Sequence, residues 1–361
     1  MAAASGRHPG WRPVATIGPA NGATYVGDFV ATGPSNAWST WGDCAPCGGP
    51  HPKQDFWIEH WTGRAWRRVA VPAAVTRLLR VTDGIAARSA DDLWLFTAGK
   101  AAHWNGKHWG IMKIPSWVVR NNLSGSVFLS VCDFGSSDLW VFSGGIDSFK
   151  PTVPFAARYN GHHWRKVRLP GVPGEAVGLG SSDIWATGSP ADLKGGRFLM
   201  HWNGKSWVKV ADPKPSGVPA HYTATIDGFL PVGPDSVWMQ QHIVKGTGIR
   251  RVDFLWHWTG RRWVRVHYGF SPDDIQAMAG DGHGGLWIAD VLATSAQTRY
   301  LAHFGAGRWS RQFVPAPKGT TVQQVSELAQ IPGTRSMWAV GGVLPVNSTE
   351  FVLGEIWKFG P

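Results

Sequence analysis

Tryptophan recurs along the chain at a nearly constant interval. Seven tryptophans each follow a small or aliphatic residue and stand 45 to 56 residues apart: Trp38, Trp94, Trp140, Trp185, Trp238, Trp287 and Trp338. Intervals of this length are typical of the blades of a β-propeller, in which each repeat is one four-stranded sheet. The spacing therefore predicts seven structural repeats.

Two further aromatic positions follow within each repeat. The second lies at the end of a strand-like run, at Trp61, Trp104, Tyr159, Trp202, Trp258, Phe304 and Trp357, and the third comes five residues later in six repeats, at Trp66, Trp109, Trp164, Trp207, Trp263 and Trp309. Asn-Gly or Thr-Gly follows the second aromatic residue in five repeats, and Asn-Gly tolerates positive φ at both central positions of a hairpin turn. The constant gap predicts two outer strands joined by a short hairpin.

The seventh repeat lacks its third tryptophan, and a matching segment stands at the other end of the chain. Gly10 to Val14 reads like the outer strands that begin at Trp66 and Trp207. We therefore predict an all-β, seven-bladed β-propeller with four antiparallel strands per blade, whose N-terminal strand closes the last blade. It forms one domain over residues 1–361, with blades at about 15–72, 73–116, 117–170, 171–213, 214–268, 269–315 and 316–361 plus 6–14. Residues 321–328 have the longest helical period, but are predicted as a strand.

Composition agrees with this fold and limits the partners. The 23 tryptophans, 46 glycines and 25 prolines suit an all-β chain rich in turns. Nearly half of the 35 basic residues fall on the predicted outer strands and hairpins, all around the rim, where charge discourages pairing between sheet edges. Despite a net charge of +11, we therefore do not expect nucleic acid as a partner. No apolar run is long enough for a membrane span, and the first residues lack the apolar region of a signal peptide, so the chain is either cytoplasmic as written or secreted with its signal peptide removed.

Two segments resemble known propeller families. Asp138 to Pro170, DLWVFSGGIDSFKPTVPFAARYNGHHWRKVRLP, is similar to a kelch-type repeat of the galactose-oxidase-like superfamily. Asp183 to Trp185, followed by Met200 to Trp207, resembles tectonin-type lectin propellers. The resemblance implies a propeller architecture without a particular activity. It places the copper-radical chemistry of galactose oxidase on no residue of this chain, and we predict no cofactor.

The face opposite the short hairpins should carry the function. The interval from first to second aromatic residue varies from 10 to 23 residues, and variable loops on a rigid scaffold are where sites normally lie. Aromatic residues that the repeat does not require fall there: Trp41 in the longest such loop, and Trp117, Tyr222 and Tyr268 in connections between blades. They are interpreted either as anchors of their own loops or as a surface for ligand stacking at the mouth of the central channel.

Two hypotheses for the function follow. The first is a binding module that recognises a glycan or a protein partner through this loop-rich face, with ligand-binding residues Trp41, Trp117, Arg120, Tyr222, Tyr268 and Arg250. The alternative is an enzyme of the hydrolase, lyase or cyclase type, in which His221 or His242 acts with Asp273 or Asp274 as acid and base.

Cysteine and histidine residues suggest structural roles. Cys44 and Cys47 with His51 suit a loop-stapling disulfide or free thiols, and more weakly a metal site or a redox dithiol. Five histidines precede the second aromatic residue of their own repeats: His60, His103, His201, His257 and His303. One histidine per blade is too dispersed for a shared metal and predicts a repeated hydrogen bond.

Overall fold

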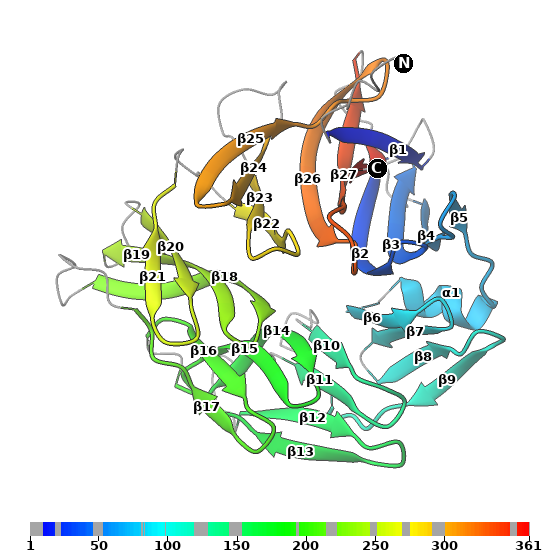
Figure 1. Cartoon of the computed structure of the whole chain (residues 1–361). Coiled ribbons are helices and arrows are strands. Elements are labelled where there is room, and N and C mark those ends of the chain that lie inside the picture. Colours follow the sequence, from blue (N-terminus) through cyan, green and yellow to red (C-terminus); the bar gives the residue numbers. More distant parts are fainter. Residues whose placement is uncertain are drawn as a thin grey trace, which may run out of the picture. The chain divides into compact units, whose positions relative to one another are not determined.

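Seven four-stranded antiparallel sheets make the chain an all-β, seven-bladed β-propeller (Figure 1). The computed structural model describes residues 10–18, 23–45, 53–80, 82, 84–97, 99–118, 129–143, 154–192, 195–213, 222–245, 251–268, 275–290, 300–346 and 352–360. The chain divides into two compact units, residues 71–268 and residues 1–70 with 269–361.

The unit of residues 71–268 holds blades 2 to 5. Blade 2 consists of β6 (Gly84–Ser89), β7 (Asp92–Thr97), β8 (Lys100–Trp104) and β9 (Trp109–Lys113), and blade 3 of β10 (Leu129–Asp133), β11 (Leu139–Ser143), β12 (Phe155–Tyr159) and β13 (Trp164–Arg168). Blade 4 consists of β14 (Val172–Gly180), β15 (Asp183–Ser189), β16 (Phe198–Trp202) and β17 (Trp207–Lys209), and blade 5 of β18 (Tyr222–Gly233), β19 (Ser236–Lys245), β20 (Arg251–Trp258) and β21 (Trp263–Val266).

The other unit holds blades 6, 7 and 1. Blade 6 consists of β22 (Ile275–Gly280), β23 (Leu286–Asp290), β24 (Tyr300–Gly305) and β25 (Arg308–Phe313), and blade 1 of β2 (Ala23–Gly33), β3 (Asn36–Ala45), β4 (Lys53–Trp61) and β5 (Trp66–Arg68). Blade 7 consists of β26 (Thr320–Gln330), β27 (Met337–Pro345), β28 (Leu353–Phe359) and the N-terminal strand β1 (Trp11–Ile17).

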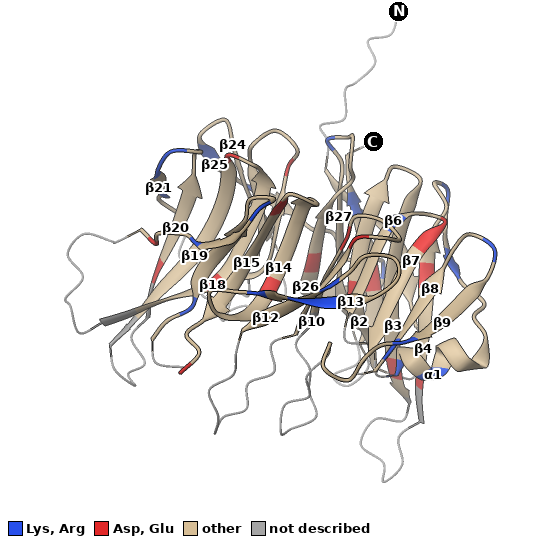
Figure 2. Cartoon of the chain, turned by 90° about the horizontal axis from the view of Figure 1, so that it is seen from below, with Lys and Arg blue, Asp and Glu red and all other residues tan. Residues whose placement is uncertain are grey.

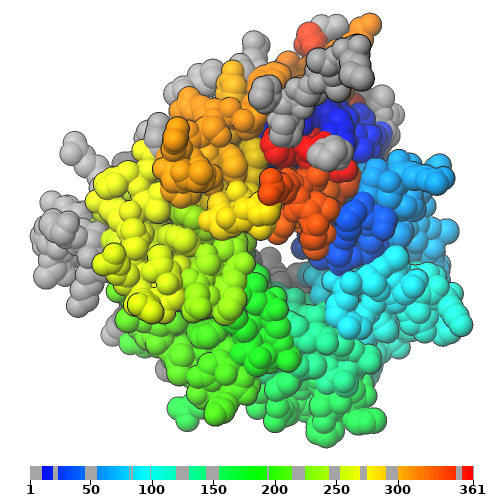
Figure 3. All heavy atoms as spheres, in the orientation of Figure 1, coloured from blue at the N-terminus to red at the C-terminus, as the bar shows by residue number. Residues whose placement is uncertain are grey.

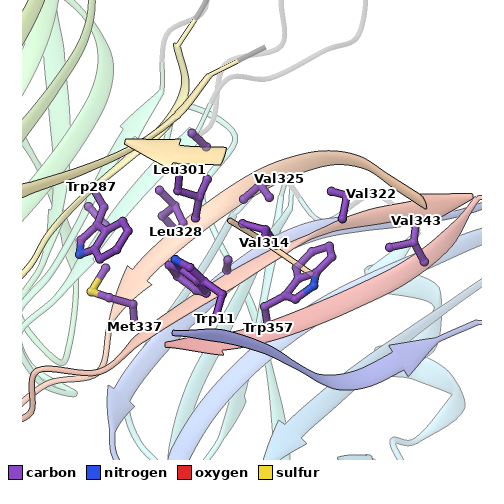
Figure 4. Packing of buried hydrophobic residues seen from close by; sticks show 13 residues of the cluster. Trp11, Trp287, Leu301, Val314, Val322, Val325, Leu328, Met337, Val343 and Trp357 are labelled. Carbon is purple, nitrogen blue, oxygen red and sulfur yellow. The ribbon is translucent and has the colours of Figure 1, made fainter. Parts of the chain in front are cut away.

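Blade 7 confirms the predicted closure by the N-terminal strand. Strand β1 is antiparallel to β28, with Trp11 opposite Phe359 and Ile17 opposite Gly354. The Trp11 ring packs edge-on against Trp287 of blade 6 at 5.4 Å between centroids, within the cluster of buried side chains that Figure 4 shows. The first and last strands of the chain are thus held together by a ladder and by a shared core.

The register of blade 7 corrects one sequence assignment. Phe359 rather than Trp357 occupies the second aromatic position, because Phe359 pairs with Trp11 as Trp61 pairs with Trp66 in blade 1. Trp357 is fully buried and donates its indole N–H to the carbonyl of Pro315 at 2.8 Å. In the other blades a hairpin turn follows the second aromatic residue, whereas blade 7 has no such turn to mark the position.

A short helix was not predicted, while the strand at residues 321–328 is confirmed as part of β26. Helix α1 (Ala73–Leu79) begins after Pro72 and buries Val75, Leu78 and Leu79. These three side chains lie at positions i, i+3 and i+4, which is a helical spacing, but the run is too short to stand out in the sequence.

The five histidines make the predicted repeated hydrogen bond. Each imidazole stacks on the first tryptophan of its blade at 3.9 to 4.4 Å between centroids. Each is also tethered by a polar side chain, in the order of the blades Asn36, Asp92, Asp183, Ser236 and Asp281. Blades 3 and 7 use Arg158 and Lys358 in the same position, above Trp140 and Trp338. A cationic or imidazole group therefore covers the first tryptophan in every blade.

Candidate functional site

Blades 3 and 4 are neighbours in the unit of residues 71–268, and Figure 3 shows them in blue-green and green. A groove of about 530 Å³ lies between their outer strands. One wall is residues 165–170, at the outer strand β13 of blade 3 and just beyond it. The other wall is the hairpin between β16 and β17 of blade 4, which contributes Trp202, Lys205, Ser206 and Trp207. Strands β13 and β17 are the outermost strands of their sheets, so the groove lies at the outer rim.

Strand alternation decides which side chains of β13 face the groove. Successive side chains of a strand point to opposite faces, so Arg165, Val167 and Leu169 share one face while Lys166 and Arg168 share the other. Val167 and Leu169 pack in the same apolar cluster as Trp202 and Trp207. Arg165 therefore lies on the face that blade 4 covers.

The hairpin of blade 4 holds Lys205 and Ser206 in a fixed turn. The side-chain oxygen of Asn203 accepts hydrogen bonds from the backbone N–H groups of Lys205 and Ser206, both at 3.0 Å. Gly204 has φ +86°, and a Cβ there would lie 2.9 Å from the Cβ of Ser182. The turn thus needs glycine for its backbone and asparagine for its side chain. The same asparagine bonds recur at Asn105 and Asn160. In these three hairpins the glycine has positive φ and the asparagine does not.

Two indoles form the floor of the groove. The rings of Trp202 and Trp207 lie 6.1 Å apart between centroids and are 8% and 9% exposed. The indole N–H of Trp202 donates to the carbonyl of Ser181 at 3.1 Å, while the N–H of Trp207 is buried and has no hydrogen-bond partner in the described part of the chain. Behind them lie Trp140 and Phe142, so the floor is rigid and apolar.

The walls are basic. Arg165, Lys166, Arg168 and Lys205 line the groove, and no acidic residue does. Figure 2 shows the basic residues along β13 in blue. The ammonium group of Lys166 lies 4.8 Å from the ring of Phe155 and 5.2 Å from that of Trp117. That cation is therefore engaged with aromatic faces.

Two of the predicted stacking residues, Trp41 and Trp117, belong to different compact units. Trp41 lies on strand β3 rather than in a loop, because β3 and β4 extend further than expected, with Trp41 opposite Trp57. It is 1% exposed, donates its N–H to the hydroxyl of Ser39 and packs over Gly354 of blade 7. Trp117 is half-buried against Phe155.

The other predicted residues are described only in part. Tyr268 is half-buried just after β21, and Tyr222 begins β18 with its side chain outside the described part. Arg120, Arg250, His221, Asp273 and Asp274 lie outside the described residues. The role of these residues stays a prediction.

Of the four residues proposed for acid–base catalysis, only His242 lies within the described part of the chain. Nδ1 of His242, on β19, lies 2.6 Å from a carboxylate oxygen of Asp227, which occupies a bulge in β18. Asp227 had not been singled out in the sequence. A carboxylate beside an imidazole is an arrangement that general bases use.

The cysteine motif is described only at its first residue. Cys44 lies on β3 opposite Gln54, while Cys47 and His51 lie outside the described residues. Cys132 on β10 is buried, and burial raises the pKa of its thiol to about 12. Among the described residues, no three His, Cys, Asp or Glu side chains gather to hold a metal ion.

The one helix of the described residues, α1, is too short to cross a membrane.

Comparison with known proteins supports the fold alone. No protein-family model and no curated protein matches the chain, so kelch-type membership remains a resemblance. An ulvan lyase of a new polysaccharide lyase family, bound to -[GlcA(1-4)Rha3S]-, is similar in structure at 11% identity and a TM-score of 0.50, over 94% of both chains. The fucose-specific lectin from Aleuria aurantia is similar at 12% identity and a TM-score of 0.43, over 84% of this chain and 100% of the lectin. The SapL1 lectin in complex with α-methyl fucoside is similar at 17% identity and a TM-score of 0.40, over 78% of this chain and 97% of the lectin.

The sequence had not indicated the groove. Trp202 and Trp207 were recognised only as repeat positions, and Arg165 and Lys205 fall among the many basic residues of the predicted outer strands and hairpins. Alignment of the repeats does not single out Arg165. The position after the third tryptophan is arginine in blades 1, 3 and 7 but Gly110, Val208, Val264 and Ser310 in blades 2, 4, 5 and 6.

Proposed function

We propose that this propeller is a glycan-binding module and that it holds a sugar in the groove between blades 3 and 4. One observation carries the proposal: a concave site combines an apolar indole floor with exposed hydrogen-bond donors on both walls. A sugar ring has C–H groups that pack on an apolar surface and hydroxyl groups that accept hydrogen bonds from Arg165, Lys205 and Ser206.

The size of the groove favours a sugar over a protein partner. Its volume of about 530 Å³ lies within the range of small-ligand sites. A stable protein partner needs about 800 Å² of surface on each side, for which one groove at the rim is too small. The proposal thus retains the glycan hypothesis but moves the site from the loop-rich face to the outer rim.

Blocking the groove at Ser206 tests this function. The Ser206→Trp substitution places a large side chain in the groove at an exposed turn position, without touching the core. His108→Trp is the matched control, because His108 is exposed at the same turn position of blade 2.

A glycan array identifies ligands, and isothermal titration calorimetry measures their affinity for each protein. S206W should bind at least about tenfold more weakly, which corresponds to a loss of about 1.4 kcal/mol, while H108W should bind like wild type. The proposal fails if the wild-type protein binds no glycan at millimolar concentration, or if S206W binds every ligand as well as wild type does.

The contact between His242 and Asp227 favours one second candidate, a polysaccharide-cleaving enzyme with His242 as acid or base. Incubation with polysaccharides, followed by a reducing-end assay, tests it. Activity should be absent in His242→Asn and strongly reduced in Asp227→Asn. Equal product from both variants and from wild type would remove this candidate.

A further inference from the structure

We infer that the groove between blades 3 and 4 selects anionic glycans and that their sulfate or carboxylate groups bind Arg165 and Lys205. This inference rests on the proposed function and specifies its ligand class. It starts from two cationic side chains that come from different blades and border the same groove.

Both cations are available to a ligand. Arg165 and Lys205 are exposed, and neither forms an ion pair within the described part of the chain. Two other arginines, Arg158 and Arg12, are already engaged. Arg158, opposite Arg165 on β12, is paired with the carboxylate of Asp138 at 2.6 Å. Arg12, the equivalent of Arg165 in blade 7, donates to the carbonyl of Gly360.

The surroundings favour an anion that bridges the two walls. No carboxylate lines the groove to offset the charge of Arg165 and Lys205. A guanidinium group matches the geometry of a sulfate or a carboxylate with two parallel hydrogen bonds, and an ammonium group adds a point charge. A group held between Arg165 and Lys205 would therefore be bound from both blades at once.

The floor favours a sugar as the carrier of the charge over a nucleic acid. Single-stranded nucleic acids gain affinity by stacking bases on open aromatic faces. Trp202 and Trp207 are about nine-tenths buried and face other aromatic rings, so they offer apolar edges rather than open faces. The C–H groups of a sugar ring can pack on such edges, and the apolar end of the groove at Leu169 and Pro170 extends that surface.

Paired ligands and charge-matched variants test the inference. The ligands are a sulfated oligosaccharide and its desulfated form, an oligouronate and its carboxyl-reduced form, and a single-stranded DNA of equal charge. The proteins are wild type, the double variant Arg165→Ala/Lys205→Ala and the double variant Arg67→Ala/Lys107→Ala. The last removes the same two charges from the equivalent positions of blades 1 and 2, outside the groove.

Titration calorimetry at low and at physiological salt gives the affinities. Wild type should prefer at least one charged oligosaccharide over its neutral form by at least about tenfold, and high salt should reduce this preference. R165A/K205A should lose the preference, and R67A/K107A should keep it. The fold of each variant is checked by near-ultraviolet circular dichroism, to which the tryptophans contribute.

Each other outcome has a separate meaning. If neutral and charged forms bind wild type equally and S206W blocks both, the glycan-binding function stands and the anionic preference is wrong. If both double variants lose affinity equally, the preference comes from the general charge of the rim and the inference is wrong. DNA that binds as tightly as the charged glycans, with the same dependence on Arg165 and Lys205, also overturns it. Binding of no glycan at all removes the proposed function itself.

Discussion

Replacing Glu355 by glutamine should remove a pH dependence from the stability of the closing blade. Glu355 lies on β28, next to β1, and is fully buried. One carboxylate oxygen accepts a hydrogen bond from the hydroxyl of Thr16 at 2.7 Å, and the other has no partner within the described residues. Burial raises the pKa of this carboxyl from 4.5 to about 7, against a smaller lowering effect of the Thr16 hydrogen bond.

The direction of the effect follows from the raised pKa. Because the carboxyl of Glu355 holds its proton more tightly in the folded than in the unfolded state, its contribution to stability is complete below pH 4.5. That contribution is lost as the pH rises through about 7. The difference between the two pKa values corresponds to about 3 kcal/mol of unfolding free energy. Glutamine cannot ionise and keeps a similar shape, so Glu355→Gln should lack this loss.

Urea denaturation of wild type and E355Q at pH 4 and pH 8.5 measures the effect. The variant should gain about 3 kcal/mol relative to wild type between the two pH values. This double difference is the change in unfolding free energy of E355Q between the two pH values minus that of wild type. The contributions of all other titrating groups cancel in it, and so does any effect of the amide that is independent of pH. Glu59→Gln is the control: burial also raises the pKa of Glu59, but the Trp57 N–H and the charge of Arg68 lower it, so its double difference should be smaller. A double difference near zero for E355Q would refute the reasoning.

Two further substitutions test the packing and the histidine tethers. Gly354→Ala should destabilise the protein by about 1–3 kcal/mol in urea denaturation, because its Cβ would lie 2.2 Å from the ring of Trp41. Gly33→Ala on β2 meets nothing within 4 Å and should change the stability by less than 1 kcal/mol; equal losses would contradict this packing. Asp281 is partly buried, which raises the pKa of its carboxyl, but hydrogen bonds from His303 and two backbone N–H groups outweigh this and lower it. Its stabilising effect is therefore present above pH 3.8 and lost below it, so Asp281→Asn should cost about 1–3 kcal/mol at pH 7 and much less at pH 2.5, and an equal cost at both would contradict the tether.

The sequence was sufficient to predict the architecture because each repeat carries the same local constraints. Trp202 and Trp207 pair across a hairpin whose turn is fixed by Asn203 and Gly204, and such a unit is recognisable within six residues. Closure was predictable because the N-terminal segment matches only the outer strand of a repeat, and the seventh repeat lacks that strand. The second aromatic position of blade 7 was not predictable, because Trp357 and Phe359 lie on the same face of β28 and only pairing with Trp11 distinguishes them.

The candidate site was not predictable for a different physical reason. Arg165 and Lys205 are 40 residues apart and belong to different repeats, so nothing in either repeat alone brings them together. In the sequence, nothing distinguishes these two residues from the many other basic residues of the predicted rim. Only the packing of β13 against the hairpin of blade 4 makes them opposite walls of one groove.

In a repeat protein of this kind, specificity should reside in departures from the repeat. The repeated residues, such as the stacked histidines and the hairpin asparagines, form hydrogen bonds within their own blade. Equivalent positions on neighbouring blades then differ only in side chains that the fold does not require. Arg165 recurs as Arg12 and Arg67, and Lys205 as Arg64, Lys107 and Arg261, whereas the position of Ser206 holds serine in blade 4 alone. The groove between blades 3 and 4 differs from the equivalent positions of the other blades by the combination of Arg165, Lys205 and Ser206 that lines it.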